Sequence, residues 1–170
     1  MSTLELPHTH GCLVCGRANP HGLHLSLLVH PETGDVTVPF TPEPHHIGFE
    51  GIIHGGVLAT ILDEAMVWAA TWSGRRFCVC GEMTVRFRHS APIGRPLTCT
   101  ARVASSRRRL IETSGEVRTS DGTLVCTATG KYVPVADNRD AAFKDTLVDE
   151  PQTHPAAAML TRGIPMDRDD

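Results

Sequence analysis

The sequence has little that would suit a nucleic-acid-binding or membrane-spanning protein. Aromatic residues make up only 5% of its 170 residues, and the formal net charge is −3. Nucleic-acid-binding domains usually carry a clear excess of basic residues, so this balance argues against that class. The sequence has no run of about 20 apolar residues, and it therefore predicts no transmembrane helix. Residues 1–10 have no basic segment followed by an apolar one, so we expect no secretory signal.

The chain has six cysteines, and three of them, in strand-like segments, look like small core residues. We expect Cys80, Cys99 and Cys126 to be small core residues, because each follows or precedes apolar residues in such a segment. Cysteines of this kind favour a reducing environment, and we expect a cytoplasmic protein.

A Cys-x-x-Cys pair, Cys12 and Cys15, lies close to the N-terminus. Four histidines flank it: His8, His10, His21 and His24. A single Cys-x-x-Cys without a second matched pair is a weak sign of a metal site. We therefore expect no metal or other cofactor, with a zinc site built from these cysteines and histidines as the alternative.

The order of the predicted elements indicates an α+β domain. We expect two strands at residues 23–29 and 35–40, then one helix at 55–72. Four further strands are expected at 77–89, 97–105, 110–119 and 123–135. Polar residues are so few in the helix that it should be buried. Turn signals between the later strands predict an antiparallel meander, and an antiparallel sheet wrapped around the helix fits this order.

Composition divides the chain into three parts. Residues 1–22 are rich in His, Gly, Pro and Cys and are expected to form an irregular lead-in. Residues 23–136 carry the strands and the helix. Residues 137–170 are polar and contain three prolines, and we expect a tail with two short helices, near residues 141–148 and 156–161.

The helical segment begins with a recognisable run. His54-Gly55-Gly56-Val57-Leu58-Ala59-Thr60-Ile61-Leu62 is followed by Asp63, nine positions after the histidine. This run, with Glu82-Met83-Thr84-Val85-Arg86-Phe87-Arg88 further on, resembles hotdog-fold acyl-CoA thioesterases. More narrowly, it is similar to the branch that includes the phenylacetate-pathway thioesterases. The resemblance implies a hotdog fold, an acyl-CoA substrate, and a homodimer or a dimer of dimers.

The resemblance also implies roles for individual residues. The Gly56 N–H would polarise the thioester carbonyl, and His54 would orient the site or cap the helix. Asp63 would face a carbonyl bound at the helix start of the partner subunit, as general base or nucleophile. Two positions depart from the family pattern: Gly48 stands where many relatives have Asn, and Cys80 where many have Ser or Thr. The alternative function is therefore a non-catalytic acyl-CoA-binding protein.

The chemistry of these residues supports the same site. Glycines at positions 55 and 56 would let a ligand approach the free N–H groups and the positive end of the helix dipole, or would allow tight packing. A carboxylate in so apolar a helix is costly unless it is paired or functional. That cost singles out Asp63. Glu64 lies about 100° further around the helix, so we expect it at the rim of the substrate site or in a dimer contact.

Two further sets of residues are candidates for holding the substrate. Cys80 is expected near the thioester end of the substrate, because it stands where many relatives of the family have Ser or Thr. Arg107, Arg108 and Arg109 occupy a predicted strand turn. Guanidinium groups bind phosphate well, so this turn is a candidate site for the phosphates of CoA, or else a solvated turn.

Overall fold

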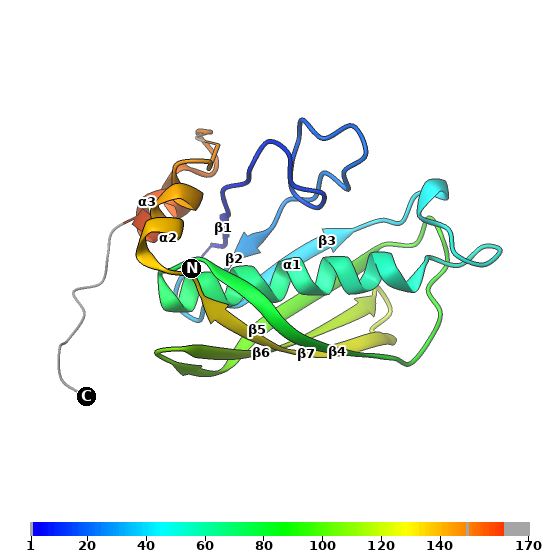
Figure 1. The fold of residues 1–170 in the computed structure, drawn as a ribbon. Coiled ribbons are helices and arrows are strands. Elements are labelled where there is room, and N and C mark those ends of the chain that lie inside the picture. Colours follow the sequence, from blue (N-terminus) through cyan, green and yellow to red (C-terminus); the bar gives the residue numbers. More distant parts are fainter. Residues whose placement is uncertain (1, 149, 162–170) are drawn as a thin grey trace.

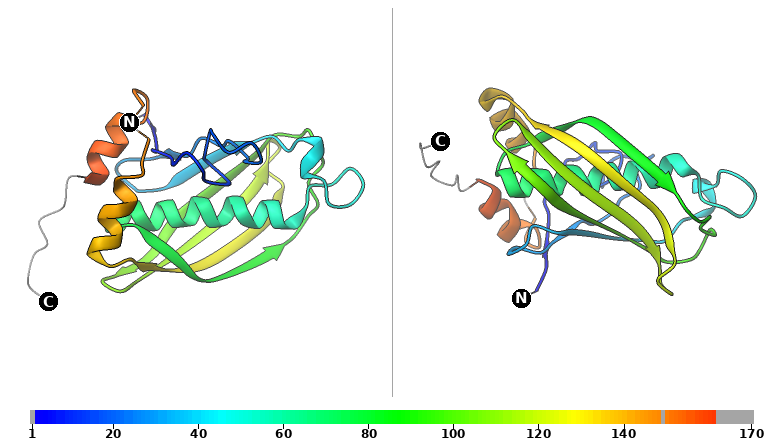
Figure 2. Two further views of the ribbon diagram at one scale, coloured as in Figure 1. Left: turned by 45° about the horizontal axis from the view of Figure 1, so that its top comes forward. Right: turned by 90° about the horizontal axis from the view of Figure 1, so that it is seen from below.

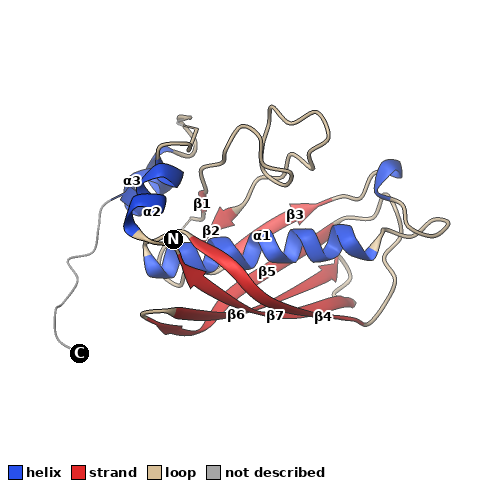
Figure 3. Cartoon of the chain, viewed as in Figure 1, coloured by secondary structure: helices blue, strands red, loops and turns tan. Residues whose placement is uncertain are grey.

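The computed structural model describes residues 2–148 and 150–161. A seven-stranded antiparallel sheet curves around one long helix, so the predicted hotdog architecture is confirmed (Figure 1; Figure 3). The elements, in chain order, are β1 (Leu4–Glu5), β2 (Leu28–Val29), β3 (Val36–Phe40), a 3-10 turn (Pro44–His46), α1 (Gly55–Gly74), β4 (Cys78–Phe87), β5 (Leu97–Arg107), β6 (Leu110–Thr119), β7 (Leu124–Pro134), α2 (Asp137–Lys144) and α3 (His154–Thr161).

Helix α1 is the centre of the core. Ten of its twenty residues are buried, and they include both tryptophans, Trp68 and Trp72. The helix begins where the His54 side chain caps it and ends where Arg75 adopts a left-handed conformation with φ of 50°. Buried side chains of β3, β5, β6 and β7 pack against it from the inner face of the sheet. Burial on this scale, more than helix propensity, fixes α1 in place.

The strand order differs from the predicted meander. The order across the sheet is β1-β2-β3-β5-β6-β7-β4, so β5, β6 and β7 form a meander, whereas β4 pairs with β7 and not with β5. The chain must cross from β4 at one edge of the sheet to β5 in its middle, passing the N-terminal end of α1 (Figure 2). One edge of β4 is therefore left without a neighbouring strand among the described residues.

The lead-in is more ordered than its composition suggests. It contributes β1, and the side chains of Leu6, Val14 and Cys15 are buried. Part of the first predicted strand, residues 23–29, is hydrogen-bonded to the lead-in and not to the main sheet. The Leu23 and Leu25 N–H groups donate to carbonyls of the lead-in, so regular pairing with the main sheet is confined to Leu28–Val29. The lead-in lies on the side of α1 that faces away from β6 and β7 (Figure 1).

The described part of the C-terminal tail packs near the end of α1. The Phe143 ring of α2 meets Phe77 edge to face, and the Phe77 N–H donates to Asp140 Oδ1 at 2.7 Å. Ala156 and Leu160 of α3 are buried. No helix in residues 2–148 and 150–161 combines the length and apolar character needed to span a bilayer.

Candidate active site

The Asp63 carboxylate is half-buried and is held by a tyrosine. Tyr132 of β7 is fully buried, and its hydroxyl donates to Asp63 Oδ1 at 2.8 Å. Burial and the charge of Asp63 raise the pKa of the Tyr132 hydroxyl well above its ordinary value. The hydroxyl therefore stays protonated at neutral pH and acts as a donor. This bond fixes one carboxylate oxygen and leaves lone pairs on the other for a further partner.

Cys80 lies beside this pair, on the neighbouring strand. It pairs with Tyr132 across β4 and β7, and the register shifts immediately after it, between Cys80 and Glu82. The expectation that Cys80 is a core residue is wrong, because the residue is exposed, whereas Cys99 and Cys126 are buried as expected. Burial of the sulfur and the charge of Asp63 raise the pKa of the Cys80 thiol. The Cys80 sulfur therefore stays a neutral thiol at neutral pH.

The bulge at Gly81 changes which face of β4 meets the helix. Beyond it, Glu82 points outward and pairs with Lys131 at 3.0 Å, while Met83 is half-buried against the core. Bulges of this kind redirect side chains and are common beside active sites. Here the bulge brings Cys80 to Asp63 and still allows the last residue of β4, Phe87, to reach the helix start.

The start of α1 forms the second part of the site. His54 Nδ1 accepts a hydrogen bond from the Gly56 N–H at 2.9 Å, so this backbone donor is already used within the chain. Because Nδ1 accepts, the ring proton lies on Nε2, and the His54 side chain is exposed. Gly48 explains how the loop holds this histidine, because a Cβ there would lie 2.9 Å from the His54 Cα. An Asn at position 48 would displace that loop.

Gly55 and its surroundings are apolar and open. A Cβ at Gly55 would lie 3.2 Å from the ring of Phe87, so glycine allows β4 to approach the helix closely. Phe87 is nevertheless 55% exposed, and Phe49 in the loop before the helix is 86% exposed. Two large exposed aromatic side chains near the helix start indicate a surface that is covered by a ligand or another chain.

One chain cannot bring both parts of the site to the same atom. Gly56 and Asp63 are seven residues apart on one helix, which is about 10.5 Å of rise. Reacting groups must approach within about 3–3.5 Å. The backbone at the helix start and the Asp63 carboxylate of a single chain are therefore too far apart to act on the same atom.

Glu64 does not lie at a rim. Its carboxylate is largely covered by the lead-in, and Oε1 accepts from Cys15 Sγ at 3.1 Å and from Trp68 Nε1 at 3.1 Å. Cys12 Sγ lies 3.6 Å from the same oxygen. Burial raises the pKa of Glu64 to about 7. The expectation of a rim or dimer contact overlooked that residues far away in the sequence fold over this face of the helix.

The arginine turn is separate from both groups. Arg107 ends β5, and Arg108 and Arg109 form the exposed β5–β6 turn. The adjoining residue Ile111 faces Gly74, so the turn lies near the C-terminal end of α1, away from His54. Within one chain the structure does not bring these arginines to the helix start.

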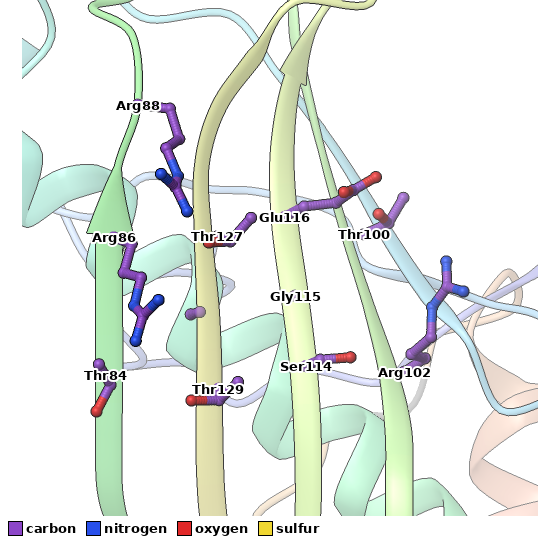
Figure 4. A pocket seen from close by; sticks show the side chains of 11 residues that line it. Thr84, Arg86, Arg88, Thr100, Arg102, Ser114, Gly115, Glu116, Thr127 and Thr129 are labelled. Carbon is purple, nitrogen blue, oxygen red and sulfur yellow. The ribbon is translucent and has the colours of Figure 1, made fainter.

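A cavity of about 680 Å³ opens on the outer face of the sheet. Arg86, Arg88 and Arg102 surround it, with threonines of β7 between them (Figure 4). Gly115 in the middle of the sheet faces Leu62 of α1, so its neighbours in β6 point away from the helix into this cavity. The cavity lies across the sheet from Asp63 and is no part of the Asp63 cluster.

Comparisons with known proteins agree with this geometry. Residues 50–126 match the family model of the thioesterase superfamily. The match includes α1, β4, β5 and β6, and therefore the helix start and Asp63. A comparison with curated proteins finds no match.

Solved structures show the same fold. A thioesterase superfamily protein is 29% identical with a TM-score of 0.68, over 73% of this chain and 60% of its own length. The present chain thus spans less than two thirds of that protein. The Escherichia coli PaaI protein from the phenylacetic acid degradation operon is 22% identical with a TM-score of 0.61, over 67% of this chain and 81% of its own. A Streptococcus mutans protein bound to acetyl CoA is 20% identical, also with a TM-score of 0.61, over 66% and 89%.

Sequence reasoning missed Tyr132. It predicted that a carboxylate in this helix must be paired or functional, but it singled out no partner for Asp63. One signal was present, because Tyr132 is the chain's single tyrosine and stands in a strand that alternates buried and exposed residues. Buried tyrosine hydroxyls usually find a hydrogen-bond partner. A polar group on the helix was the natural one.

Proposed function

We propose that this protein hydrolyses the thioester of a CoA-linked acyl group, giving the free acid and CoA. The observation that carries the proposal is the Asp63 carboxylate, which sits in an apolar helix, is oriented by Tyr132 and borders exposed Cys80. A carboxylate placed in this way serves as a general base for water or as a nucleophile toward a carbonyl carbon. The match to the thioesterase superfamily and the CoA-bound relative support the substrate class.

The working unit would be two copies of the chain. In an antiparallel pair of α1 helices, the Asp63 side chain of one copy can face the helix start of the other. The free edge of β4 and exposed Phe87 and Phe49 support such a pair, because both features would be covered in it. Each substrate carbonyl would then lie between backbone donors of one copy and the carboxylate of the other.

The same pairing would also place the arginine turn at a distance from the shared site that suits the phosphates of CoA. Suppose that Asp63 of the first copy lies level with Gly56 of the second. Gly74 of the first copy then lies about 13.5 Å beyond His54 of the second, measured along the helix axes. The turn that contains Arg107, Arg108 and Arg109 neighbours Gly74 through Ile111. The phosphates of CoA lie at the far end of its long pantetheine arm from the thioester. Arginines at this distance would suit them.

A second function is favoured by the capping bond at the helix start. Because His54 Nδ1 already accepts from the Gly56 N–H, a substrate oxygen gains that donor only when the histidine ring turns away. A site in which the ring stays in place would bind acyl-CoA without strong polarisation of the carbonyl. The second candidate is therefore a non-catalytic acyl-CoA-binding protein.

Turnover of a panel of acyl-CoA thioesters, followed by detection of the released thiol, tests the proposal. We expect at least one acyl class to be hydrolysed with a kcat/KM of about 10⁴ M⁻¹ s⁻¹ or more. Binding of CoA should be measured on the same preparation by calorimetry. A protein that binds acyl-CoA but releases no thiol from any member of the panel would refute the first function and support the second.

A further inference from the structure

Three side chains able to ligate a metal converge between the lead-in and α1. The Sγ atoms of Cys12 and Cys15 and a carboxylate oxygen of Glu64 lie within 4.8 Å of one another. Cys15 is buried, and the other two are half-buried. The cysteines come from the lead-in and the glutamate from the helix, so the group joins segments 49 and 52 residues apart in the sequence.

The charges of this group are incomplete. A carboxylate taken out of water is costly unless a positive charge or strong donors accompany it. None of the ion pairs among residues 2–148 and 150–161 includes Glu64. Its neighbours are two thiols, which are weak donors, and the indole N–H of Trp68. A divalent cation among these three groups would supply the missing charge.

The distances agree with tetrahedral zinc. Zinc binds thiolate sulfur at about 2.3 Å and carboxylate oxygen at about 2.0 Å, and a tetrahedral angle between these bonds sets the two ligand atoms about 3.5 Å apart. The sulfur-to-oxygen distances here are 3.6 Å from Cys12 and 3.1 Å from Cys15. Thiolate ligands select zinc over magnesium or calcium. The Trp68 N–H bond to Glu64 orients the carboxylate, as a supporting donor does around bound metals.

The turn that carries the two cysteines is tightly built. The Val14 N–H donates to Cys12 Sγ at 3.3 Å, and the Gly16 N–H donates to the Cys12 carbonyl at 3.0 Å. A Cβ at Gly16 would lie 2.5 Å from two backbone atoms of Cys12, so no other residue fits without moving the turn. Hydrogen bonds from Leu23 and Leu25 fasten the same turn from outside. Both sulfurs are thus held toward α1 by backbone geometry.

We propose that Cys12, Cys15 and Glu64 bind one Zn²⁺ ion, with a water molecule as the fourth ligand. The ion fastens the lead-in to the middle of α1, one residue along from Asp63. Both thiolate ligands come from the lead-in and the carboxylate ligand comes from α1, so the role assigned to the ion is to hold these two segments together. The flanking histidines do not belong to the site, because among the described residues no histidine nitrogen joins the three ligand atoms.

Zinc content and cobalt substitution test this site on the full chain. Protein prepared under reducing conditions, loaded with zinc sulfate and dialysed should retain about one zinc per chain by mass spectrometry of the metal. Replacement by Co²⁺ should give the visible absorption of a tetrahedral site and a thiolate-to-cobalt charge-transfer band. Loss of a supporting residue typically costs about 10–100-fold in metal affinity, so Cys12→Ser and Glu64→Gln should each weaken zinc binding by at least about 100-fold.

Matched variants distinguish this site from others. His21→Gln, an exposed histidine from the same segment, should keep the native zinc content and cobalt spectrum. Circular dichroism reports whether Glu64→Gln folds, and Cys12→Ser alone decides the outcome if it does not. The proposal is overturned if the native chain retains no zinc or if the variants bind it with native affinity.

Discussion

Asp63→Asn separates the chemistry of the carboxylate from its place in the fold. Asparagine has the same shape as aspartate. Its carbonyl oxygen can still accept from the Tyr132 hydroxyl, whose oxygen lies 2.8 Å from Asp63 Oδ1 in the native chain. It can neither accept a proton from water nor attack as an anion. Loss of a general base typically lowers the rate about 10²–10⁴-fold, and we expect kcat for acyl-CoA hydrolysis to fall by that factor.

The stability of the same variant should change little. A hydrogen bond to a charged group contributes about 1.5–3 kcal/mol and one between neutral groups about 0.5–1.5 kcal/mol. Exchanging one for the other at the Tyr132 hydroxyl should lower the free energy of unfolding by about 1 kcal/mol. Urea denaturation measures this directly. A rate loss with so small a change in stability assigns the effect to chemistry.

The control is Asp145→Asn, which makes the same chemical change at an exposed residue at the end of α2. It should keep both native turnover and native stability. The catalytic role of Asp63 is refuted if Asp63→Asn retains turnover within about threefold of the native rate, because loss of a carboxylate that accepts the proton or attacks the carbonyl lowers the rate far more than that. That role is also refuted if CoA affinity falls as far as kcat, since the residue would then act in binding.

Three further variants test other parts of the structure. Tyr132→Phe leaves the site carboxylate without its donor, and we expect kcat to fall about 10–100-fold with KM nearly unchanged in steady-state assays. Gly16→Ala forces a Cβ to within 2.5 Å of backbone, and should cost about 1–3 kcal/mol in urea denaturation; Gly11→Ala, where a Cβ meets nothing within 4 Å, should cost little. Phe87→Glu should shift the protein from dimer to monomer in light scattering and abolish turnover, while Glu82→Gln on the outer face should do neither. A monomeric native protein with full activity would contradict the shared site.

The helix and most strands were predictable because their signals are local. The wide apolar coverage of residues 55–72 predicts a buried helix, and the structure places α1 at Gly55–Gly74. Turn residues on both sides of β6 give its bounds, Leu110–Thr119, as expected. The place of β4 was not predictable in this way. Turn signals tell where strands end, but pairing between β4 and β7 depends on how the whole sheet closes around α1.

The same difference between local and long-range signals applies to the candidate site. Asp63 stands out in the sequence because a charge in an apolar helix is costly wherever the helix is buried. Its partner Tyr132 lies 69 residues away, and the thiols that cover Glu64 lie about 50 residues before it. Contacts at such separations depend on the completed fold, so neither the periodicity of the helix nor the spacing of the Cys-x-x-Cys pair predicts them.

The position of β4 also determines when this chain can finish folding during its synthesis. The strand is synthesised directly after α1, but its partner residues in β7 extend from Cys126 to Pro134. Cys78 therefore cannot pair until Pro134, 56 residues later, has been synthesised. Until the ribosome has released that segment, ten residues of β4 have unpaired N–H and C=O groups on both sides. Exposed strands of this kind join readily with other chains, and long-range pairing of this kind is slow. The newly made chain is therefore most prone to aggregate in the interval between the synthesis of β4 and that of β7, which is when chaperones would be needed.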